Sequence, residues 1–219
     1  MSRTTSRVPE PASFRSIEDI RRAPREAGLS AEDWADAALW SLENGVDSLS
    51  VERLARSLGV TKGGFYWHYK DRSDVLQAAL SRWEEWATTR VIQRLEALPD
   101  PRARLRQLLE LTFEQGAHGR IEVALVAGAS SDPRIQPVLA RVSQLRIDYV
   151  TRLYRALGLP ARDARRWALQ AYSTYVGLLH LSIASPESLG TSRARTEYVQ
   201  HVVRTLIPVR GAPHFPAGR

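Results

Sequence analysis

The sequence predicts an all-α fold of about nine helices, and three observations support this prediction. From Ser30 onward, apolar residues recur at spacings of three and four, which is the period of a helix with one buried face. Each interruption of this pattern falls at a glycine, a proline or a residue that commonly caps helices. The chain has 219 residues, 43% of them hydrophobic, which is enough for a sizeable core.

Capping residues delimit the first two helices. Ser30, followed three residues later by Asp33, begins the first helix, and Gly45 ends it. Ser50 begins the second helix, and Gly59 ends it because glycine readily adopts the left-handed conformation that closes a helix. The apolar face of the second helix consists of Val51, Leu54, Ala55 and Leu58. Both segments are therefore predicted as amphipathic helices.

Residues 50–69 have the spacing of a helix-turn-helix unit, in which the second helix enters the major groove of DNA. The bracing helix is residues 50–58, the turn is Gly59-Val60, and the reading helix is residues 61–69. Two adjacent glycines in the reading helix cost about 1 kcal/mol each relative to alanine, which close approach to DNA would offset. The outward positions of this helix are Lys62, Gly63, Gly64, Tyr66, Trp67 and His68.

The segment from Gly59 to Arg72, GVTKGGFYWHYKDR, resembles the TetR family of bacterial transcriptional repressors, and the likeness covers residues 29–76. The resemblance implies a three-helix DNA-binding domain over these residues. It also implies that Tyr66 and Lys70 hold operator phosphates and that Thr61 caps the reading helix. The residues expected to face bases are Lys62, Gly64, Trp67 and His68. Ser50 and Gly63 complete the expected DNA-binding set.

Some of these positions have alternative interpretations. Trp67 could be an ordinary core aromatic, His68 could satisfy a backbone group, and Lys70 could be a solvent-exposed lysine. The family often has a basic residue at the position of Glu52. A glutamate there could accept a hydrogen bond from cytosine N4 or simply face solvent.

The two ends of the chain differ from the helix-turn-helix segment. Residues 1–28 are polar, contain three prolines and show no sustained period, so we expect a disordered tail. Its arginines could alternatively reach an adjacent minor groove. Residues 77–219 are predicted to form a larger helical bundle, which the resemblance assigns to effector binding and dimerisation. The fourth helix, Asp71 to Leu98, has no interior glycine or proline and predicts a rigid connection between the two parts.

Residues 163–184 carry apolar side chains around nearly the whole helix, so this helix must be buried on all sides. One face can meet its own bundle, while the opposite face needs a second molecule. The last helix has a similarly wide apolar stripe. We therefore expect these two helices to form a homodimer contact, as in the resembled family, against the alternative of a purely intramolecular core. The expected interface residues are Trp167, Ala171, Leu178, Leu181, Tyr198, Val202 and Leu206.

Large aromatic residues in the C-terminal part could line an effector pocket, because several combine an apolar ring with a polar tip. The alternative is that they are ordinary core residues. The candidates are Trp83, Trp86, Phe113, Tyr149, Tyr172 and Tyr175. No cluster of His, Asp and Glu has metal-ligand spacing, so neither a metal nor a cofactor is expected.

Composition narrows the function further. The net charge is +7, but residues 30–80 hold five basic against eight acidic side chains, so a DNA-binding prediction rests on local arrangement rather than bulk charge. No apolar run approaches the roughly 20 residues that span a bilayer. The absence of cysteine suits the cytoplasm.

No catalytic motif is present, and we expect no enzymatic activity. The sequence predicts a DNA-binding repressor that is a homodimer on a pseudopalindromic operator and is released by a small-molecule effector. The alternatives are an activator, a sequence-tolerant DNA-binding protein and, least favoured, a helical enzyme.

Overall fold

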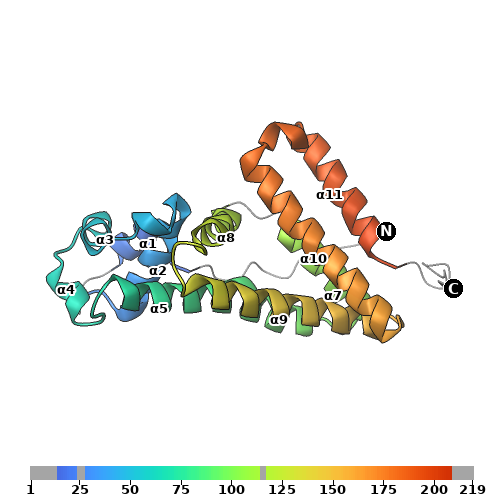
Figure 1. The fold of residues 1–219 in the computed structure, drawn as a ribbon, viewed down its shortest axis with the longest axis horizontal. Coiled ribbons are helices and arrows are strands. Elements are labelled where there is room, and N and C mark those ends of the chain that lie inside the picture. Colours follow the sequence, from blue (N-terminus) through green and yellow to red (C-terminus); the bar gives the residue numbers. More distant parts are fainter. Residues whose placement is uncertain (1–13, 24–27, 114–116, 209–219) are drawn as a thin grey trace. The chain divides into compact units, whose positions relative to one another are not determined.

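A computed structural model describes residues 14–23, 28–113 and 117–208, and these residues form helices without a single strand (Figure 1). The predicted all-α class is therefore confirmed. The described chain divides into two compact units. The first contains the residues up to Arg94 together with 117–142, and the second contains 95–116 and the residues from Ser143 onward.

The predicted helix starts are confirmed in the first unit. Ser30 caps α2 (Ala31–Ser41), Ser50 caps α3 (Val51–Leu58), and Asp71 caps α5 (Arg72–Glu84). In each case the capping side chain accepts a hydrogen bond from the backbone amide three residues later, which satisfies an amide that the helix leaves unpaired. These helices enclose a core that includes Trp34, Ala37, Ala38, Leu54, Leu58, Phe65, Leu76 and Leu80.

The predicted disorder of residues 1–28 is wrong for residues 14–23, which contain α1 (Ile17–Arg22). Ser16 and Asp19 form a reciprocal capping box, and the side chains of Phe14 and Ile20 are buried in the core of the first unit. A helix of six residues is too short to display a period in the sequence. Residues 1–13 and 24–27, also part of that expectation, lie outside the described residues.

The fourth predicted helix is continuous, but it is not uniform. It runs through α5, a π-helical segment η3 (Glu85–Thr89) and α6 (Arg90–Glu96). The amide of Arg90 donates to the carbonyl of Glu85, five residues earlier. The Arg90 guanidinium lies 3.8 Å from the centroid of the Trp86 ring and pairs with the Glu85 carboxylate at 2.7 Å. This π-helical segment is a local departure from the regular helix that the sequence predicts here.

The first unit also includes α8 (Ala117–Gly128) and the beginning of α9 (Ile135–Ala156), so its limit does not coincide with the domain boundary predicted after residue 76. Ile121 and Leu125 of α8 and Ile135 of α9 belong to the same hydrophobic core as the helix-turn-helix residues. Local sequence patterns do not reveal such long-range packing.

The second unit contains α7 (Pro101–Phe113), the rest of α9, α10 (Ala161–Ala184), a 3-10 turn η4 (Pro186–Leu189) and α11 (Ser192–Leu206). Helix α7 contacts both α10 and α11. The buried Tyr154 of α9 donates its hydroxyl hydrogen bond to the carbonyl of Leu206 at 2.7 Å. None of the described helices has the length and apolar character needed to cross a membrane.

Candidate nucleic-acid interface

The turn between the two helices of the predicted reading unit is tight. Gly59 ends α3 in the left-handed conformation, with a φ of 68°. Its amide donates to the carbonyl of Arg56 at 3.2 Å, and the next amide, of Val60, donates to the carbonyl of Ala55 at 3.0 Å. These bonds close α3 and direct the chain into the following helix after a few residues.

The reading helix itself is shorter than predicted. Helix α4 covers Gly63–Tyr66, and Lys62 occupies its N-cap position without a side-chain capping bond. The capping role predicted for Thr61 is therefore wrong. Phe65 anchors the helix instead, since its fully buried ring lies 5.4 Å from the ring centroid of Trp34 and 5.7 Å from that of Tyr69. A buried aromatic anchor fixes a helix this short without strong caps.

Two aromatic side chains of this segment point away from the core. Tyr66 is 59% exposed and Trp67 is 88% exposed. The alternative of an ordinary core position is therefore wrong for Trp67. The neighbouring Tyr69 takes the core position, because its hydroxyl donates to the carbonyl of Ala31 at 2.8 Å. Exposed aromatic rings beside a short helix are available for contact with a partner.

The two glycines are not required by packing within the chain. A Cβ atom at Gly63 would lie 3.8 Å from the nearest atom, Oγ1 of Thr61. A Cβ atom at Gly64 would lie 3.9 Å from Cζ2 of Trp34, which is ordinary contact. Both positions are exposed. Packing within the described part of the chain therefore does not account for these two glycines.

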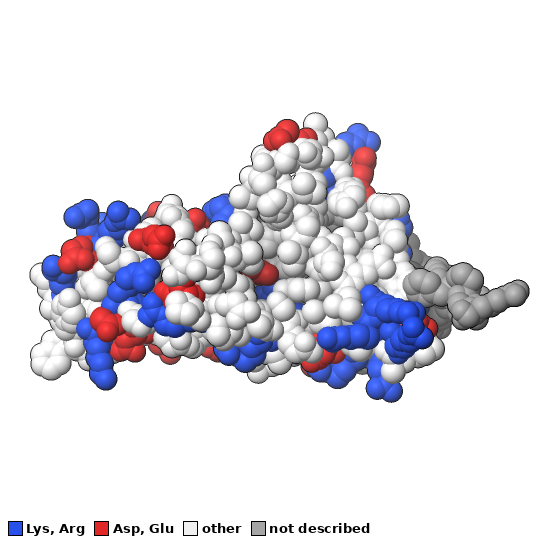
Figure 2. All heavy atoms as spheres, viewed as in Figure 1, with Lys and Arg blue, Asp and Glu red and all other residues white. Residues whose placement is uncertain are grey.

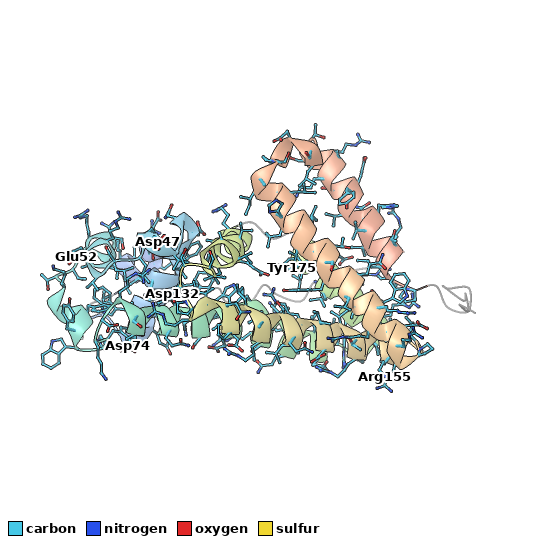
Figure 3. All side chains as sticks on the ribbon, in the orientation of Figure 1. Asp47, Glu52, Asp74, Asp132, Arg155 and Tyr175 are labelled. Carbon is cyan, nitrogen blue, oxygen red and sulfur yellow. The ribbon has the colours of Figure 1, made fainter. Side chains whose placement is uncertain are left out.

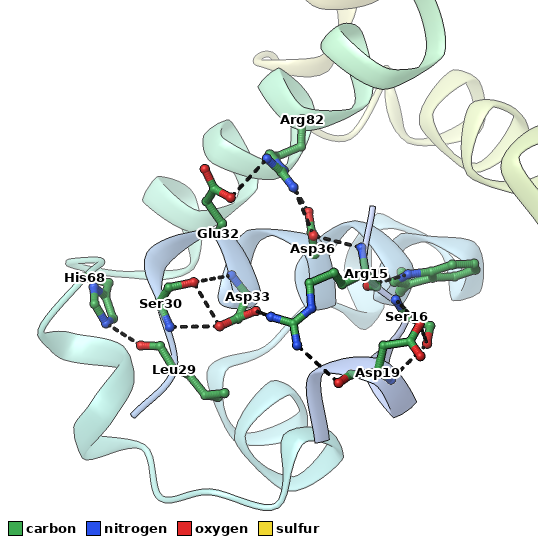
Figure 4. A network of polar contacts seen from close by, with 11 residues as sticks. Arg15, Ser16, Asp19, Leu29, Ser30, Glu32, Asp33, Asp36, His68 and Arg82 are labelled. Carbon is green, nitrogen blue, oxygen red and sulfur yellow. Dashed lines mark hydrogen bonds and ion pairs between the residues drawn. The ribbon is translucent and has the colours of Figure 1, made fainter. Parts of the chain in front are cut away.

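His68 forms a hydrogen bond to the backbone of another segment. Its Nε2 lies 2.8 Å from the carbonyl oxygen of Leu29, as Figure 4 shows. Since a carbonyl only accepts, this nitrogen carries the hydrogen and donates it. The alternative that His68 satisfies a backbone group describes this contact, and its role toward bases stays a prediction. The bond ties the end of the reading segment to the residue just before the α2 N-cap.

Lys62 and Glu52 form an ion pair that was not predicted, with Nζ 2.8 Å from Oε1. The hydrogen bond and the charge of Glu52 raise the pKa of Lys62, and the same bond from Lys62 lowers the pKa of Glu52. Lys70 is exposed, and its backbone amide donates to Oδ2 of Asp74 at 3.1 Å. Lys70, which is predicted to hold a phosphate, therefore lies just before the N-cap of α5.

A buried carboxylate, that of Asp36, joins three segments of the first unit. Asp36 of α2 accepts two hydrogen bonds from Arg82 of α5 and a third from the backbone amide of Arg15 (Figure 4). The Arg15 guanidinium in turn pairs with Asp33 at 2.5 Å. These contacts join the segment before α1 to α2 and α5. They span 21 and 46 residues, so no local sequence signal could have identified them.

Charge on this unit is mixed rather than uniformly basic. Figure 2 shows Lys and Arg side chains interspersed with Asp and Glu over its visible face. Figure 3 labels three of these carboxylates, Asp47, Glu52 and Asp74. This agrees with the excess of acidic side chains counted in residues 30–80. The predicted contact with DNA would therefore depend on a few side chains rather than on the overall charge.

The predicted effector residues do not form one described site. Trp83 and Trp86 are buried in the core of the first unit, and Tyr149 and Tyr175 are buried in the second. The side chain of Phe113 lies outside the described residues. Two candidates do meet: the rings of Tyr172 and Tyr175 have centroids 6.2 Å apart. The Tyr172 hydroxyl also lies 2.8 Å from Oγ of Ser143.

The predicted dimer residues separate into two groups. Five are buried within their own chain and are unavailable to a partner, which corrects the prediction for Trp167, Ala171, Leu178, Val202 and Leu206. Leu181 and Tyr198 are exposed. Three further apolar residues of α10 that were not in the predicted set are exposed as well: Leu169, Val176 and Ile183. All five exposed side chains are between 39% and 44% exposed. A helix apolar all round does not reveal from sequence which side faces its own core.

Among the described side chains, no group of three His, Asp or Glu residues is arranged to hold a metal ion. The features that stand out are instead the exposed aromatics and the glycine-lined start of α4, presented by a helix-turn-helix. This geometry defines a helix-turn-helix protein of the kind found in transcriptional regulators.

Comparison with known proteins shows which family the helix-turn-helix segment resembles. Residues 36–79 match the family model of bacterial regulatory proteins, tetR family. The HTH-type transcriptional regulator AcrR of Shigella flexneri is 39% identical over 56 residues, which are 25% of this chain and 26% of that protein. The resemblance to the TetR family is therefore confirmed on the helix-turn-helix segment, and the match covers about a quarter of this relative.

Solved structures share the fold over most of the chain. A transcriptional regulator from Rhodococcus sp. Rha1 has a TM-score of 0.65 and 19% identity, covering 82% of this chain and 94% of that one. The regulator FadR from Bacillus subtilis, solved in complex with stearoyl-CoA, has a TM-score of 0.55 and 16% identity, covering 80% and 96%. At these identities the likeness establishes the all-helical fold.

Proposed function

We propose that this protein is a sequence-specific DNA-binding repressor that acts in the cytoplasm as a homodimer on a pseudopalindromic operator. The observation that carries the proposal is the outer surface of α4 and the residues that follow it. Tyr66 and Trp67 are exposed there, beside two glycines that no contact within the chain requires. The tetR-family match over residues 36–79 supports the same function.

DNA binding is tested on duplexes selected by the wild-type protein from a randomised library. Tyr66 and Lys70 are assigned to phosphates, so Tyr66→Phe and Lys70→Ala weaken binding to every sequence. Lys70→Ala also lowers the salt slope by about one unit, because one phosphate contact is lost. Arg193→Ala, which removes a positive charge from the exposed end of α11, is the control and leaves both quantities unchanged. Binding by Lys70→Ala that matches the wild type at every salt concentration would reject this assignment.

The homodimer follows from the small size of one reading helix, which covers only a few base pairs. The exposed residues Leu169, Val176 and Ile183 recur every seven positions along α10, which places them on one stripe suited to a symmetric contact. Val176→Arg is expected to give a monomer in sedimentation velocity and weak binding to the full palindrome. Leu145→Arg, at an equally exposed apolar residue of α9, is the control. A Val176→Arg protein that stays dimeric would reject this stripe as the interface.

We assign effector binding to the second unit. FadR from Bacillus subtilis, with the same fold, was solved with stearoyl-CoA, which supports a partly apolar effector here. A ligand weakens operator binding only if it favours one conformation over another, and DNA must weaken the ligand equally. Titration of fatty acids and acyl-CoA esters, with and without operator, measures this reciprocity. Equal ligand affinity with and without operator would reject the coupling. A separate experiment, expression of a reporter gene under the operator, distinguishes repression from activation.

A further inference from the structure

Glu52 and Lys62 are joined across the helix-turn-helix. Glu52 lies in the first turn of α3 and Lys62 at the N-cap of α4, and Nζ is 2.8 Å from Oε1. Both side chains remain more than half exposed, at 58% and 52%. Exposed ion pairs contribute little to stability because water solvates both charges. Stability therefore does not explain this pair, and its role is sought in the surface to which it belongs.

That surface is the reading edge of the unit. In helix-turn-helix proteins the N-terminal residues of the second helix contact base edges. Lys62 immediately precedes α4, and its contact brings the Glu52 carboxylate to the same edge. The next residue, Arg53, points elsewhere, since its guanidinium donates to the carbonyl of Ser48 at 3.3 Å. Glu52 is thus the α3 side chain that the structure ties to the start of the reading helix.

The pair presents an acceptor and a donor side by side, which is complementary to the major-groove edge of a C·G base pair. Cytosine N4 donates there, and guanine O6 and N7 accept. N4 and O6 are hydrogen-bonded to each other, so they lie about 2.9 Å apart, close to the Lys62–Glu52 separation. In a T·A pair the carboxylate would face the acceptor O4 of thymine, and the ammonium would face the donor N6 of adenine beside its acceptor N7.

We propose that Glu52 is a specificity-determining residue of the operator interface. Its carboxylate accepts from cytosine N4 while Lys62 donates to the guanine of the same base pair, with the ion pair intact. Because the pair has no net charge, it also lowers attraction to arbitrary DNA, whose phosphates would otherwise attract a free Lys62. The hydrogen bond from Lys62 lowers the pKa of Glu52, whose carboxylate is ionised at neutral pH and therefore only accepts. This inference rests on the proposed operator binding.

The test compares wild type and Glu52→Ala on the selected duplex, on all its single base-pair variants and on an unrelated duplex, at several salt concentrations. Wild type should prefer C·G at one position of each half-site by about 5- to 100-fold, and Glu52→Ala should lose that preference alone. The variant should also bind the unrelated duplex more tightly, with a salt slope steeper by about one unit, because Lys62 is released. Lys62→Ala should weaken the preference for C·G at the same position.

Glu197→Ala is the matched control, because it removes a carboxylate from another exposed ion pair, with Arg193 on α11. It should leave base preference and salt slope unchanged. Thermal melting should show that Glu52→Ala folds like the wild type. The proposal is overturned if Glu52→Ala changes affinity equally on every duplex, or if wild type discriminates other positions but no C·G pair. A wild-type protein that prefers no sequence at all would instead refute operator binding itself.

Discussion

Arg82 of α5 and Asp36 of α2 form a fork-like ion pair, with Nε 2.7 Å from Oδ1 and Nη2 3.0 Å from Oδ2. The Asp36 side chain is only 1% exposed, and the amide of Arg15 supplies a further hydrogen bond to it. A carboxylate buried this deeply is tolerated because its oxygens are all paired. This contact fixes α2, on which the reading segment is anchored, against α5.

Removing this carboxylate is expected to destabilise the protein strongly. Asp36→Ala leaves the Arg82 guanidinium without its main partner, and breaking a buried ion pair costs about 3 to 5 kcal/mol of the free energy of unfolding. Urea denaturation measures this loss. Glu32→Ala is the control, since Glu32 lies 3.6 Å from the same arginine but is 77% exposed. Equal stability losses in the two variants would show that burial is not the deciding factor.

Gly128, at the end of α8, packs closely against Val46 of the 3-10 turn Val46–Ser48. A Cβ atom at this position would lie 2.5 Å from Cγ2 of Val46. Gly128→Ala is therefore expected to lower the free energy of unfolding by about 1 to 3 kcal/mol through overpacking. Val46→Ala should partly rescue it in the double variant. In α10, Gly177→Ala has open space around the new atom, so it should be neutral or stabilising. A stable Gly128→Ala protein would contradict this packing.

Low pH should weaken the ion pairs that Asp132 forms with Arg134 and Arg72. Arg134 and, at 3.8 Å, Arg72 face this carboxylate, and the hydrogen bond from Arg134 lowers its pKa. A carboxylate with a lower pKa in the folded protein stabilises it above the unfolded pKa of about 3.9, and this stability is lost as the pH falls through the folded value. Asp132→Asn should thus be less stable than wild type at neutral pH.

The two stability curves should converge below about pH 4, where protonation removes the charge from the wild-type side chain as well. Unfolding measured from about pH 7 to pH 2 tests this convergence. Asp47→Asn removes an exposed carboxylate of the same unit and is the control (Figure 3). A constant difference between wild type and Asp132→Asn over this range would refute the assignment.

The His68 contact predicts a positional effect rather than a loss of base reading. Because Nε2 donates to the carbonyl of Leu29, His68→Ala removes a hydrogen bond worth about 0.5 to 1.5 kcal/mol and loosens the end of the reading segment. Affinity should fall by a similar factor on all single base-pair variants of the selected duplex. A loss confined to one base position would restore the base-facing role. Trp67→Ala, at the exposed neighbour, should keep the melting temperature of the wild type.

Local signals account for the parts of the fold that were predicted. The starts of α2, α3 and α5 depend on a capping residue and an amide three positions away, so a few neighbouring residues suffice to specify them. The same holds for the glycine turn after α3. The exposure of Tyr66 and Trp67 also follows from helical spacing once Phe65 is assigned to the core.

Four other features depend on residues far apart in the chain. The pairs His68 with Leu29, Glu52 with Lys62 and Asp36 with Arg82 span 39, 10 and 46 positions, and no periodic pattern encodes them. The exposed stripe of α10 could not be predicted from the sequence, because this helix is apolar on nearly all sides. The sequence alone predicted most of the helices, the helix-turn-helix and the resemblance of that segment to the TetR family, because capping, turn chemistry and amphipathic period act over a few residues. Only tertiary packing decided which side of α10 is committed to the core and which distant polar groups pair, since burial depends on what the rest of the chain places opposite each face.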